Sequence, residues 1–391
     1  MSRYHSYLNS ATEILSAYKG EEPLSSFLKK FFAASKKYGS KDRKQISHLC
    51  YCYFRLGKAE LDISIEERIL IALFLCSNES NEILENLKPE WNENVRISVK
   101  EKCSMFNSQY SMFNVFFPWK DELSEGIDYE KFNESFFIQP DLFLRLRPGK
   151  EHQVKQKFQQ AEIDFKEMNS TCLSLANTSK IENIIELNKE AVVQDYNSQQ
   201  TGEHIRIAIA NCQLPIAVWD CCAASGGKSI MAKDILGDIE LTVSDIRESI
   251  LINLKKRFSE AGIADYKSKV VDLTNSKLKT QNSKFDIVIC DAPCTGSGTW
   301  PRTPEQLFYF EKSKIEEYVV KQKKIVSNTV PHLKPGGYLL YITCSVFEKE
   351  NEDVVDFIKQ QFKMEEIKTE VLKGYDKKAD TMFAALLQKP L

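Results

Sequence analysis

The chain has 391 residues, of which 42% are hydrophobic and 28% are charged, and its formal net charge is −2. This balance is typical of a globular protein with a large core, and it excludes a disordered or collagen-like chain and a polycationic nucleic-acid coat. The longest apolar run, Ile69–Cys76, is far shorter than the roughly 20 residues of a membrane-spanning helix. The first residues contain no apolar stretch, and the eleven cysteines are an odd number. We therefore expect a cytoplasmic protein with reduced thiols and no membrane association.

The first 130 residues have apolar side chains at the three- and four-residue spacing of helices, as in Leu24, Leu28 and Phe32. Within them, residues 29–58 contain nine Lys or Arg and a single acid. Such a run is ordinarily a solvated helix face, and the alternative is a surface that contacts nucleic-acid phosphates. This segment alone leaves both interpretations open.

From residue 136 the pattern changes to the two-residue alternation of a strand. Leu142, Leu144 and Leu146 alternate with a face that carries Arg145 and Arg147. We therefore expect a helical domain over residues 1–130 and a small mixed α+β segment over residues 131–210.

After about residue 210, short apolar segments alternate with amphipathic ones. The apolar segment 285–291 is typical of a strand buried on both faces, and the alternation requires crossover connections. We expect residues 211–391 to form an open α/β domain with a mostly parallel sheet, which binds ligands beyond the carboxyl ends of its strands. The expected strands are 216–221, 240–245, 268–273, 285–291 and 337–344, and the expected helices are 228–236, 247–261, 311–333 and 348–361.

The first of these strands ends in a loop of small residues with Gly226 and Gly227, directly before a helix. Such a loop lets the backbone pass close to a ligand at the helix N-terminus. Gly227, Lys228 and Ser229 match the end of a phosphate-binding P-loop, but Cys222 stands where that motif requires its first glycine. We therefore do not expect a nucleoside triphosphatase.

Acidic residues follow or close three further strands: Asp245, Asp272 and Asp291. An acid after the second strand of such a sheet can accept hydrogen bonds from ribose hydroxyls. Three acids would repel a polyphosphate, whereas a cationic sulfonium that carries ribose and adenine would be favoured. The alternative for each aspartate is an ordinary turn or cap residue.

Two cysteines come directly after strands, Cys294 after the fourth and Cys344 at the end of the fifth. Adjacent strands of one sheet would bring both thiols to the same edge. Most of the other cysteines are expected to be buried small hydrophobes, namely Cys50, Cys52, Cys76, Cys103, Cys172 and Cys290. Cys344 has no second cysteine at zinc-ligand spacing and the five histidines are scattered along the chain, so we expect no metal site.

A thiol, a carboxyl group and a methyl-donor pocket together suit methylation of a pyrimidine at carbon 5. Addition of a thiolate to carbon 6 turns the ring into an enamine that can attack a sulfonium methyl group. A carboxyl group that shares a proton with the ring nitrogen lowers the barrier. A proton must then leave carbon 5 and the thiol must be expelled, and a second group near the ring can assist.

These residues resemble the Nol/Nop/Sun (Fmu) family of S-adenosylmethionine-dependent RNA cytosine-5 methyltransferases, from about residue 130 onward. The resemblance implies a Rossmann-like class I methyltransferase fold with a mostly parallel seven-stranded sheet. The matching segments are the cofactor loop Asp220–Lys228, the fourth motif Asp291–Cys294, the sixth motif Thr343–Ser345, and also Val193–Gln199 and Asp380–Phe383.

By this resemblance Cys344 would be the nucleophile, Cys294 would help product release, and Asp291 would contact the methionine end and the cytosine. The residues implied to line the cofactor are Cys222, Ala223, Ala224, Ser225, Gly226, Gly227, Lys228, Asp245, Asp272 and Asp291. The chain departs from the family pattern at Ser225, where the family usually has proline, and at Trp300-Pro301, after the fourth motif.

The segment 28–55 resembles the NusB-like helical domain that precedes the catalytic part in some bacterial members, and this favours contact with RNA. The predicted RNA-contacting residues are Lys36, Lys37, Lys41, Arg43, Lys44, Arg145, Arg147 and Arg302. We expect ribosomal RNA as the substrate, transfer RNA as the second choice, and a monomer. The alternatives are a DNA cytosine methyltransferase, which would use Cys294 as its nucleophile and leave Cys344 idle, and a non-catalytic RNA-binding protein.

Overall fold

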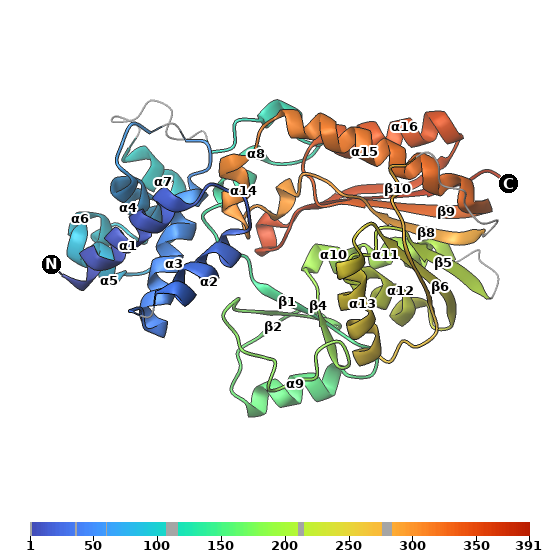
Figure 1. Cartoon of the computed structure of the whole chain (residues 1–391), viewed down its shortest axis with the longest axis horizontal. Helices are drawn as coiled ribbons and strands as arrows, with labels where there is room; N and C mark the ends of the chain where they lie inside the picture. The colour runs from blue at the N-terminus through green and yellow to red at the C-terminus, as the bar shows by residue number, and fades with distance from the viewer. Residues whose placement is uncertain (1, 36, 60, 107–115, 210–214, 276–283) are drawn as a thin grey trace. The chain divides into compact units, whose positions relative to one another are not determined.

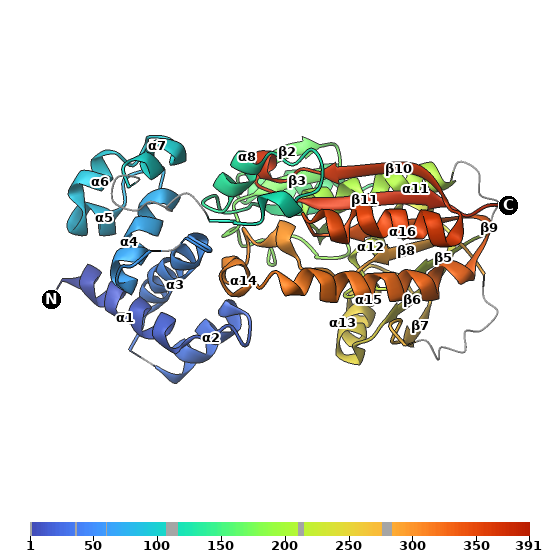
Figure 2. The same ribbon diagram turned by 90° about the horizontal axis from the view of Figure 1, so that it is seen from above.

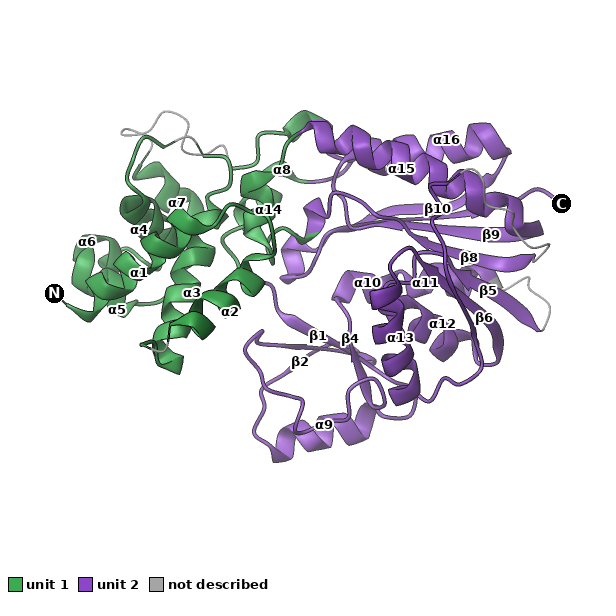
Figure 3. Cartoon of the chain, viewed as in Figure 1, with its two compact units in different colours: residues 1–121, 128–139, 299–311 green, residues 122–127, 140–298, 312–391 purple. Residues whose placement is uncertain are grey.

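The computed structural model describes the chain except for residues 1, 36, 60, 107–115, 210–214 and 276–283 (Figure 1). The described residues divide into two units (Figure 3). The first, the helical unit, comprises residues 1–121, 128–139 and 299–311, and the second, the sheet unit, comprises residues 122–127, 140–298 and 312–391. In the described part of the chain, every helix is too short or too polar to span a bilayer.

The helical unit is built around α4, whose residues 69–75 are all buried because each of them is apolar. The helices expected from the spacing of Leu24, Leu28 and Phe32 and from the basic segment are confirmed as α2 and α3. The helices of this unit are α1 (Arg3–Ala17), α2 (Leu24–Ala34), α3 (Ser40–Arg55), α4 (Ile65–Cys76), α5 (Glu82–Leu87), α6 (Pro89–Glu93), α7 (Val99–Ser104), α8 (Tyr129–Ser135) and α14 (Pro304–Tyr309).

Helix α14 and its flanks were expected in the α/β domain, but the structure places residues 299–311 in the helical unit. Trp300 is buried there, with ring centroids 4.7 Å from Phe310 and 6.1 Å from both Phe117 and Trp119. The departure from the family pattern at Trp300 therefore supplies a core side chain of this unit.

Of the expected small mixed segment, residues 131–139 belong to the helical unit, and the part from residue 140 onward contains a four-stranded antiparallel sheet in the order β2-β3-β1-β4, within the sheet unit. The predicted strand is confirmed as β1, and its leucines pack on Val154 and Phe158 of the following helix. The elements are β1 (Leu142–Leu146), α9 (Glu151–Gln160), β2 (Lys166–Asn169), β3 (Cys172–Leu175) and β4 (Ala191–Val193), followed by α10 (Tyr196–Gln200) and α11 (Gly202–Ile209).

The larger sheet has seven strands in the order β10-β11-β9-β8-β5-β6-β7, and only β11 runs antiparallel to its neighbours. The prediction of a mostly parallel seven-stranded sheet is therefore confirmed. Helices α15 and α16 cover one face and α11, α12 and α13 the other (Figures 1 and 2). Its elements are β5 (Ile216–Asp220), α12 (Gly227–Leu236), β6 (Ile239–Asp245), α13 (Glu248–Glu260), β7 (Lys267–Val270), β8 (Phe285–Asp291), α15 (Ser313–Thr329), β9 (Leu333–Thr343), α16 (Glu352–Phe362), β10 (Glu365–Leu372) and β11 (Met382–Gln388).

The strand order reverses between β5 and β8. The chain runs outward from β5 through β6 to β7, and then returns to β8 on the other side of β5. At such a reversal the connections on either side leave in opposite directions, which opens a crevice beyond the carboxyl ends of the strands. Asp220 and Asp291 end these two strands, so the topology places the candidate residues at the crevice.

Candidate active site

The two predicted thiols meet at the carboxyl edge of β8 and β9. The parallel register pairs Asp291 with Ile342, and the amide of Ala292 donates to the Ile342 carbonyl at 2.9 Å. The chain therefore leaves both strands at the same level, and the Sγ atoms of Cys294 and Cys344 are 3.3 Å apart. The prediction that adjacent strands bring these two cysteines together is confirmed.

The thiol of Cys294 holds its proton. Its hydrogen bond with Cys344 is the main cause that raises the pKa of Cys294 well above its usual value, and burial adds to it. Cys294 is therefore a neutral thiol, and either sulfur can donate the hydrogen bond between the two.

A buried cation lies beside this pair. The Nζ atom of Lys228, on α12, is 2.7 Å from Oδ2 of Asp291 at the end of β8. Burial alone would lower the pKa of Lys228, but the carboxylate of Asp291 outweighs it, and Cys344 acts in the same direction, so this pKa is raised. Lys228 therefore stays charged and fixes the Asp291 carboxylate.

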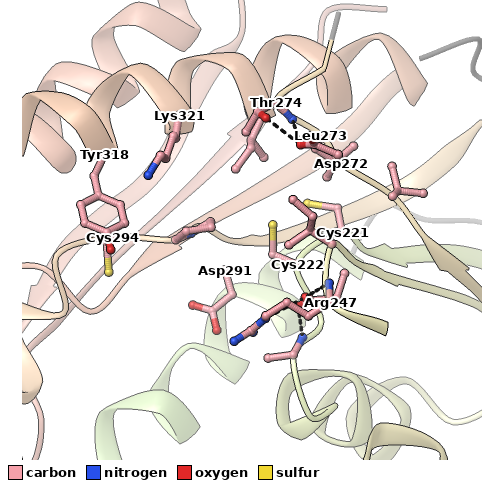
Figure 4. A pocket seen from close by; sticks show the side chains of 16 residues that line it. Cys221, Cys222, Arg247, Asp272, Leu273, Thr274, Asp291, Cys294, Tyr318 and Lys321 are labelled. Atoms are coloured by element: carbon pink, nitrogen blue, oxygen red, sulfur yellow. Dashed lines mark hydrogen bonds and ion pairs between the residues drawn. The ribbon is translucent and has the colours of Figure 1, made fainter. Parts of the chain in front are cut away.

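A cavity of about 560 Å³ opens beside Cys294, and residues predicted at the ends of strands line it (Figure 4). Oδ2 of Asp245 accepts from the Ala224 amide at 3.0 Å, and Asp272 accepts from the amide and hydroxyl of Thr274, which lowers the pKa of Asp272. The predicted residues that line this cavity are Cys222, Ala224, Asp245, Asp272, Asp291 and Cys294. Arg247, Tyr318 and Lys321 also line it and were not predicted as site residues.

A second cavity, of about 290 Å³, lies on the other side of the glycine loop. Residues of the two other segments that resemble the family, Val193–Gln199 and Asp380–Phe383, line this cavity. The two segments are joined by hydrogen bonds: the Asp380 amide donates to Asp195 at 3.1 Å, and the Asn197 side chain donates to the Asp380 carbonyl at 2.7 Å. The predicted residues that line this second cavity are Cys222, Ala223, Ala224, Ser225, Gly227, Lys228, Asp291 and Cys344.

Gly226 lines neither cavity and has a backbone role instead. Its φ of +84° is left-handed, and a Cβ atom there would lie 2.6 Å from the Phe258 ring. Only glycine fits this position without displacing Phe258. The loop can therefore turn tightly from β5 into α12.

The loop is also tethered at Ser225, where the family usually has proline. Arg257 of α13 donates to the Ser225 hydroxyl at 2.7 Å and to its carbonyl at 3.1 Å. These two hydrogen bonds hold the turn at the position where a proline ring would otherwise restrict it.

Asp220, at the end of β5, is fully buried beneath the loop. The Ser229 hydroxyl donates to its Oδ2 at 2.6 Å, while its Oδ1 has no hydrogen-bond partner among the described residues. Burial raises the pKa of Asp220 to about 7, and the charge of Asp291 adds to this. This pKa shift was not predictable from the sequence, because burial depends on packing against distant elements.

Three further thiols cluster under the first cavity. The Sγ atoms of Cys221, Cys222 and Cys290 all lie within 4.8 Å of one another, and these thiols hydrogen-bond among themselves. Burial raises the pKa of Cys221 well above its usual value. Cys290 is buried, as expected, and it lies in this cluster because β8 is next to β5. Three thiols are one ligand fewer than a structural zinc site requires.

The structure gives Arg145 and Arg147 a different role from the predicted RNA contact. Both form ion pairs with Asp234 of α12, at 2.6 and 2.7 Å, and the Arg145 side chain is only 8% exposed. Arg147 also donates to the carbonyls of Asn188 and Ala261. Both guanidinium groups are therefore paired with a carboxylate inside the sheet unit, and these ion pairs attach the small sheet to α12.

The basic residues predicted in the helical unit differ from these. Lys37, Lys41, Arg43 and Lys44 are exposed, at the end of α2 and the start of α3, whereas Lys36 lies outside the described residues. Arg302 is half-buried near α14. Contact of these residues with RNA stays a prediction.

Comparison with known proteins agrees with this geometry. Residues 209–387 match the family model described as 16S rRNA methyltransferase RsmB/F. This part of the chain is similar to the methyltransferases that the model describes. The predicted family resemblance is therefore confirmed for the part of the chain that contains the two thiols and the glycine loop.

The similarity to curated RsmB/F relatives is partial. The ribosomal RNA small subunit methyltransferase B of Shewanella oneidensis is 32% identical over 140 residues, which cover 35% of this chain and 32% of that protein. The protein of the same name from Xanthomonas campestris pv. campestris is 28% identical over 170 residues, 43% of this chain and 38% of that protein. The chain thus matches about a third of the length of these relatives.

Solved structures share the fold of this RsmB/F-like chain. The crystal structure of PH0851 covers 100% of both chains with a TM-score of 0.70 and 18% identity. NSun6 from Pyrococcus horikoshii, solved with SFG, covers 66% of this chain and 93% of its own, with a TM-score of 0.58 and 15% identity.

Proposed function

We propose that this protein is an S-adenosylmethionine-dependent methyltransferase that methylates carbon 5 of cytosine in RNA. The observation that carries the proposal is the 3.3 Å approach of Cys294 and Cys344 beside the ion pair of Asp291 and Lys228. A thiol nucleophile, a second thiol and a carboxylate are the groups that this reaction requires. We also propose that the protein acts as a cytoplasmic monomer.

The residues around the first cavity fit S-adenosylmethionine. Asp245 and Asp272 offer carboxylate oxygens to ribose hydroxyls, the loop through Cys222 and Ala224 leaves backbone exposed to a ligand, and the Asp291 carboxylate suits an ammonium or sulfonium group. When bound there, the cofactor supplies the electrophilic methyl group.

In this mechanism the Cys344 sulfur forms a bond with carbon 6 of the cytosine, and the electron pair of the 5,6 double bond moves onto carbon 5. The Asp291 carboxylate accepts the proton that the Cys344 thiol loses and passes it to the ring nitrogen that gains electron density, while Lys228 fixes the orientation of this carboxylate. A cytosine inside a helix cannot reach these groups, so the base must be turned out of its stack.

Cys294 acts in the second half of the reaction. Once the Cys344 sulfur is bonded to carbon, the hydrogen bond between the two thiols is lost, and with it the main cause of the high Cys294 pKa. Cys294 then releases its own proton to solvent and takes the proton from carbon 5. The 5,6 double bond re-forms, the bond between sulfur and carbon 6 breaks, and the electron pair returns to Cys344.

The relatives from Shewanella and Xanthomonas are named as ribosomal RNA methyltransferases, which supports ribosomal RNA as the substrate here. The exposed basic residues Lys37, Lys41, Arg43 and Lys44 support a role for the helical unit in binding the RNA backbone. We infer that the small sheet supports the larger sheet, which carries the two thiols.

Transfer of a tritiated methyl group from S-adenosylmethionine to ribosomal RNA, transfer RNA and DNA tests this proposal. We expect incorporation into ribosomal RNA at cytosine carbon 5, located by sequencing of bisulfite-treated product. Incorporation into DNA alone would overturn the RNA assignment, and incorporation into transfer RNA alone would overturn the ribosomal one. Absence of cofactor binding by calorimetry would indicate a non-catalytic RNA-binding protein.

A further inference from the structure

Between the two thiol loops lies the carboxyl group of Glu350, which is fully buried. It accepts hydrogen bonds from both loops: the Thr295 amide donates to Oε1 at 2.9 Å, and the hydroxyls of Thr295 and Ser345 donate to Oε2. Thr295 directly follows Cys294, and Ser345 directly follows Cys344. One side chain therefore connects the neighbours of both thiols.

The opposite side of Glu350 is held by α15. The amide group of Gln322 donates to Oε1 of Glu350 at 3.0 Å and also to the carbonyl of Pro293 at 3.0 Å. The Glu350 backbone is fixed as well, because the Tyr341 hydroxyl donates to its carbonyl at 2.7 Å. The thiol loops are thus attached to a helix and to the middle of the sheet through this residue.

This arrangement is costly for stability. Burial raises the pKa of Glu350, although four hydrogen-bond donors oppose the effect, and among the described residues Glu350 has no ion pair. A buried carboxyl group without a cation is expensive to retain. We therefore look for a role of the Glu350 carboxyl group other than packing.

We propose that Glu350 is a positioning residue that holds Cys294 and Cys344 at reacting distance. The inference rests on the proposed function only in that it takes these two thiols as the reacting groups. Glu350 touches neither sulfur, and it acts through Thr295 and Ser345. Because small misplacements of reacting atoms cost large factors in rate, a loss of this connection is expected to lower kcat rather than cofactor affinity.

The test measures thiol alignment without methyl transfer. The azo oxidant diamide is reduced to its hydrazine as two thiols become a disulfide, and peptide mapping of the full chain gives the rate of formation of the Cys294–Cys344 bond. We expect Glu350→Ala to slow this rate roughly ten- to a hundred-fold, Glu350→Gln to slow it less, and calorimetric affinity for S-adenosylmethionine to stay unchanged.

The matched control is Glu352→Gln. Glu352 is also a partly buried carboxyl group with a raised pKa, caused by burial, but its hydrogen bond goes to Ser124 and not to a thiol loop. It is expected to change stability without changing the rate of disulfide formation. Thr295→Val, which removes only one hydroxyl donor, provides a milder variant if Glu350→Ala does not fold, and it is expected to slow the rate by a smaller factor.

Disulfide formation at the wild-type rate in folded Glu350→Ala, or in Thr295→Val where the former does not fold, would overturn the inference. An equal slowing in Glu352→Gln would also overturn it, because the effect would then be general destabilisation. If the wild type aligns its thiols but transfers no methyl group to any nucleic acid, the proposed function fails while the positioning role of Glu350 stands.

Discussion

Two clusters of cationic side chains in this protein differ in their exposure and in their ion pairing. The lysines and arginine at the end of α2 and the start of α3 are exposed in the helical unit, whereas Arg145 and Arg147 of β1 are held by Asp234 inside the sheet unit. Both clusters were predicted to contact RNA on residue type alone. The difference shows that a cation is available to a partner only where the fold gives it no acid of its own.

The largest effect is expected when Asp234, the partner of the two buried arginines, is replaced. Asp234→Asn leaves two largely buried guanidinium groups without their carboxylate, and breaking such a buried pair from one side costs about 3–5 kcal/mol. We expect the free energy of unfolding, measured in urea, to fall by about this amount. Arg145→Met with Asp234→Leu, which removes opposite charges together, should recover part of the loss; no recovery would mean that the ion pair is not the cause.

Asp220 is a buried acid, and it differs from the buried arginines because its hydrogen-bond partner is a hydroxyl group and not a group of opposite charge. Its pKa is raised to about 7 by burial, against about 4 in an unfolded chain. The folded state therefore favours the protonated form, and this contribution to stability is full below about pH 4 and is lost as pH rises through about 7. Relative to Asp220→Asn, the wild type should become progressively less stable between about pH 4 and pH 7 in urea titrations; a constant difference would contradict the pKa assignment.

For the exposed cluster we expect a loss of binding and not of stability. The triple variant Lys37→Gln, Lys41→Gln and Lys44→Gln should reduce the slope of log affinity against log salt for RNA by about 2, since each phosphate contact contributes about 0.7–0.9. The change in unfolding free energy should stay within about 0.5 kcal/mol per site. Lys255→Gln, an exposed lysine of α13, is the control; an equal effect per charge there would show that the α2–α3 surface has no special role.

The smallest effect is expected at the cofactor loop. Ser225→Ala removes one hydroxyl that accepts from Arg257, and a single hydrogen bond of this kind contributes about 0.5–1.5 kcal/mol. We expect a several-fold weaker affinity for S-adenosylmethionine by calorimetry, with Ser225→Pro closer to the wild type. An unchanged affinity in Ser225→Ala would mean that the loop does not need this tether.

The parts of the fold and site that were predictable from the sequence are those with local signals. The apolar run 285–291 predicted β8 with its correct bounds, and the adjacency of strands then predicted that Cys294 lies near Cys344. The hairpin of β10 and β11 was not predicted, because β10 is an edge strand with a half-exposed, charged sequence.

Features that depend on distant packing were not predictable. Alternation in β1 shows that Arg145 and Arg147 share a face, but not that this face meets Asp234 of α12. Likewise, the 5-residue separation of Ser345 and Glu350 gives no sign that Glu350 also binds Thr295, 55 residues earlier. Tyr318 and Lys321 line the first cavity only because α15 covers that end of the sheet.

The central claim is that Cys344 bonds to the cytosine and that Cys294 releases the product. Its most direct test is denaturing electrophoresis of protein incubated with S-adenosylmethionine and substrate RNA. Cys294→Ala should accumulate a covalent complex of protein with methylated RNA, and the further change Cys344→Ala should abolish it. A complex that survives in the double variant, or one that forms in Cys344→Ala alone, would contradict the assignment of the two sulfurs.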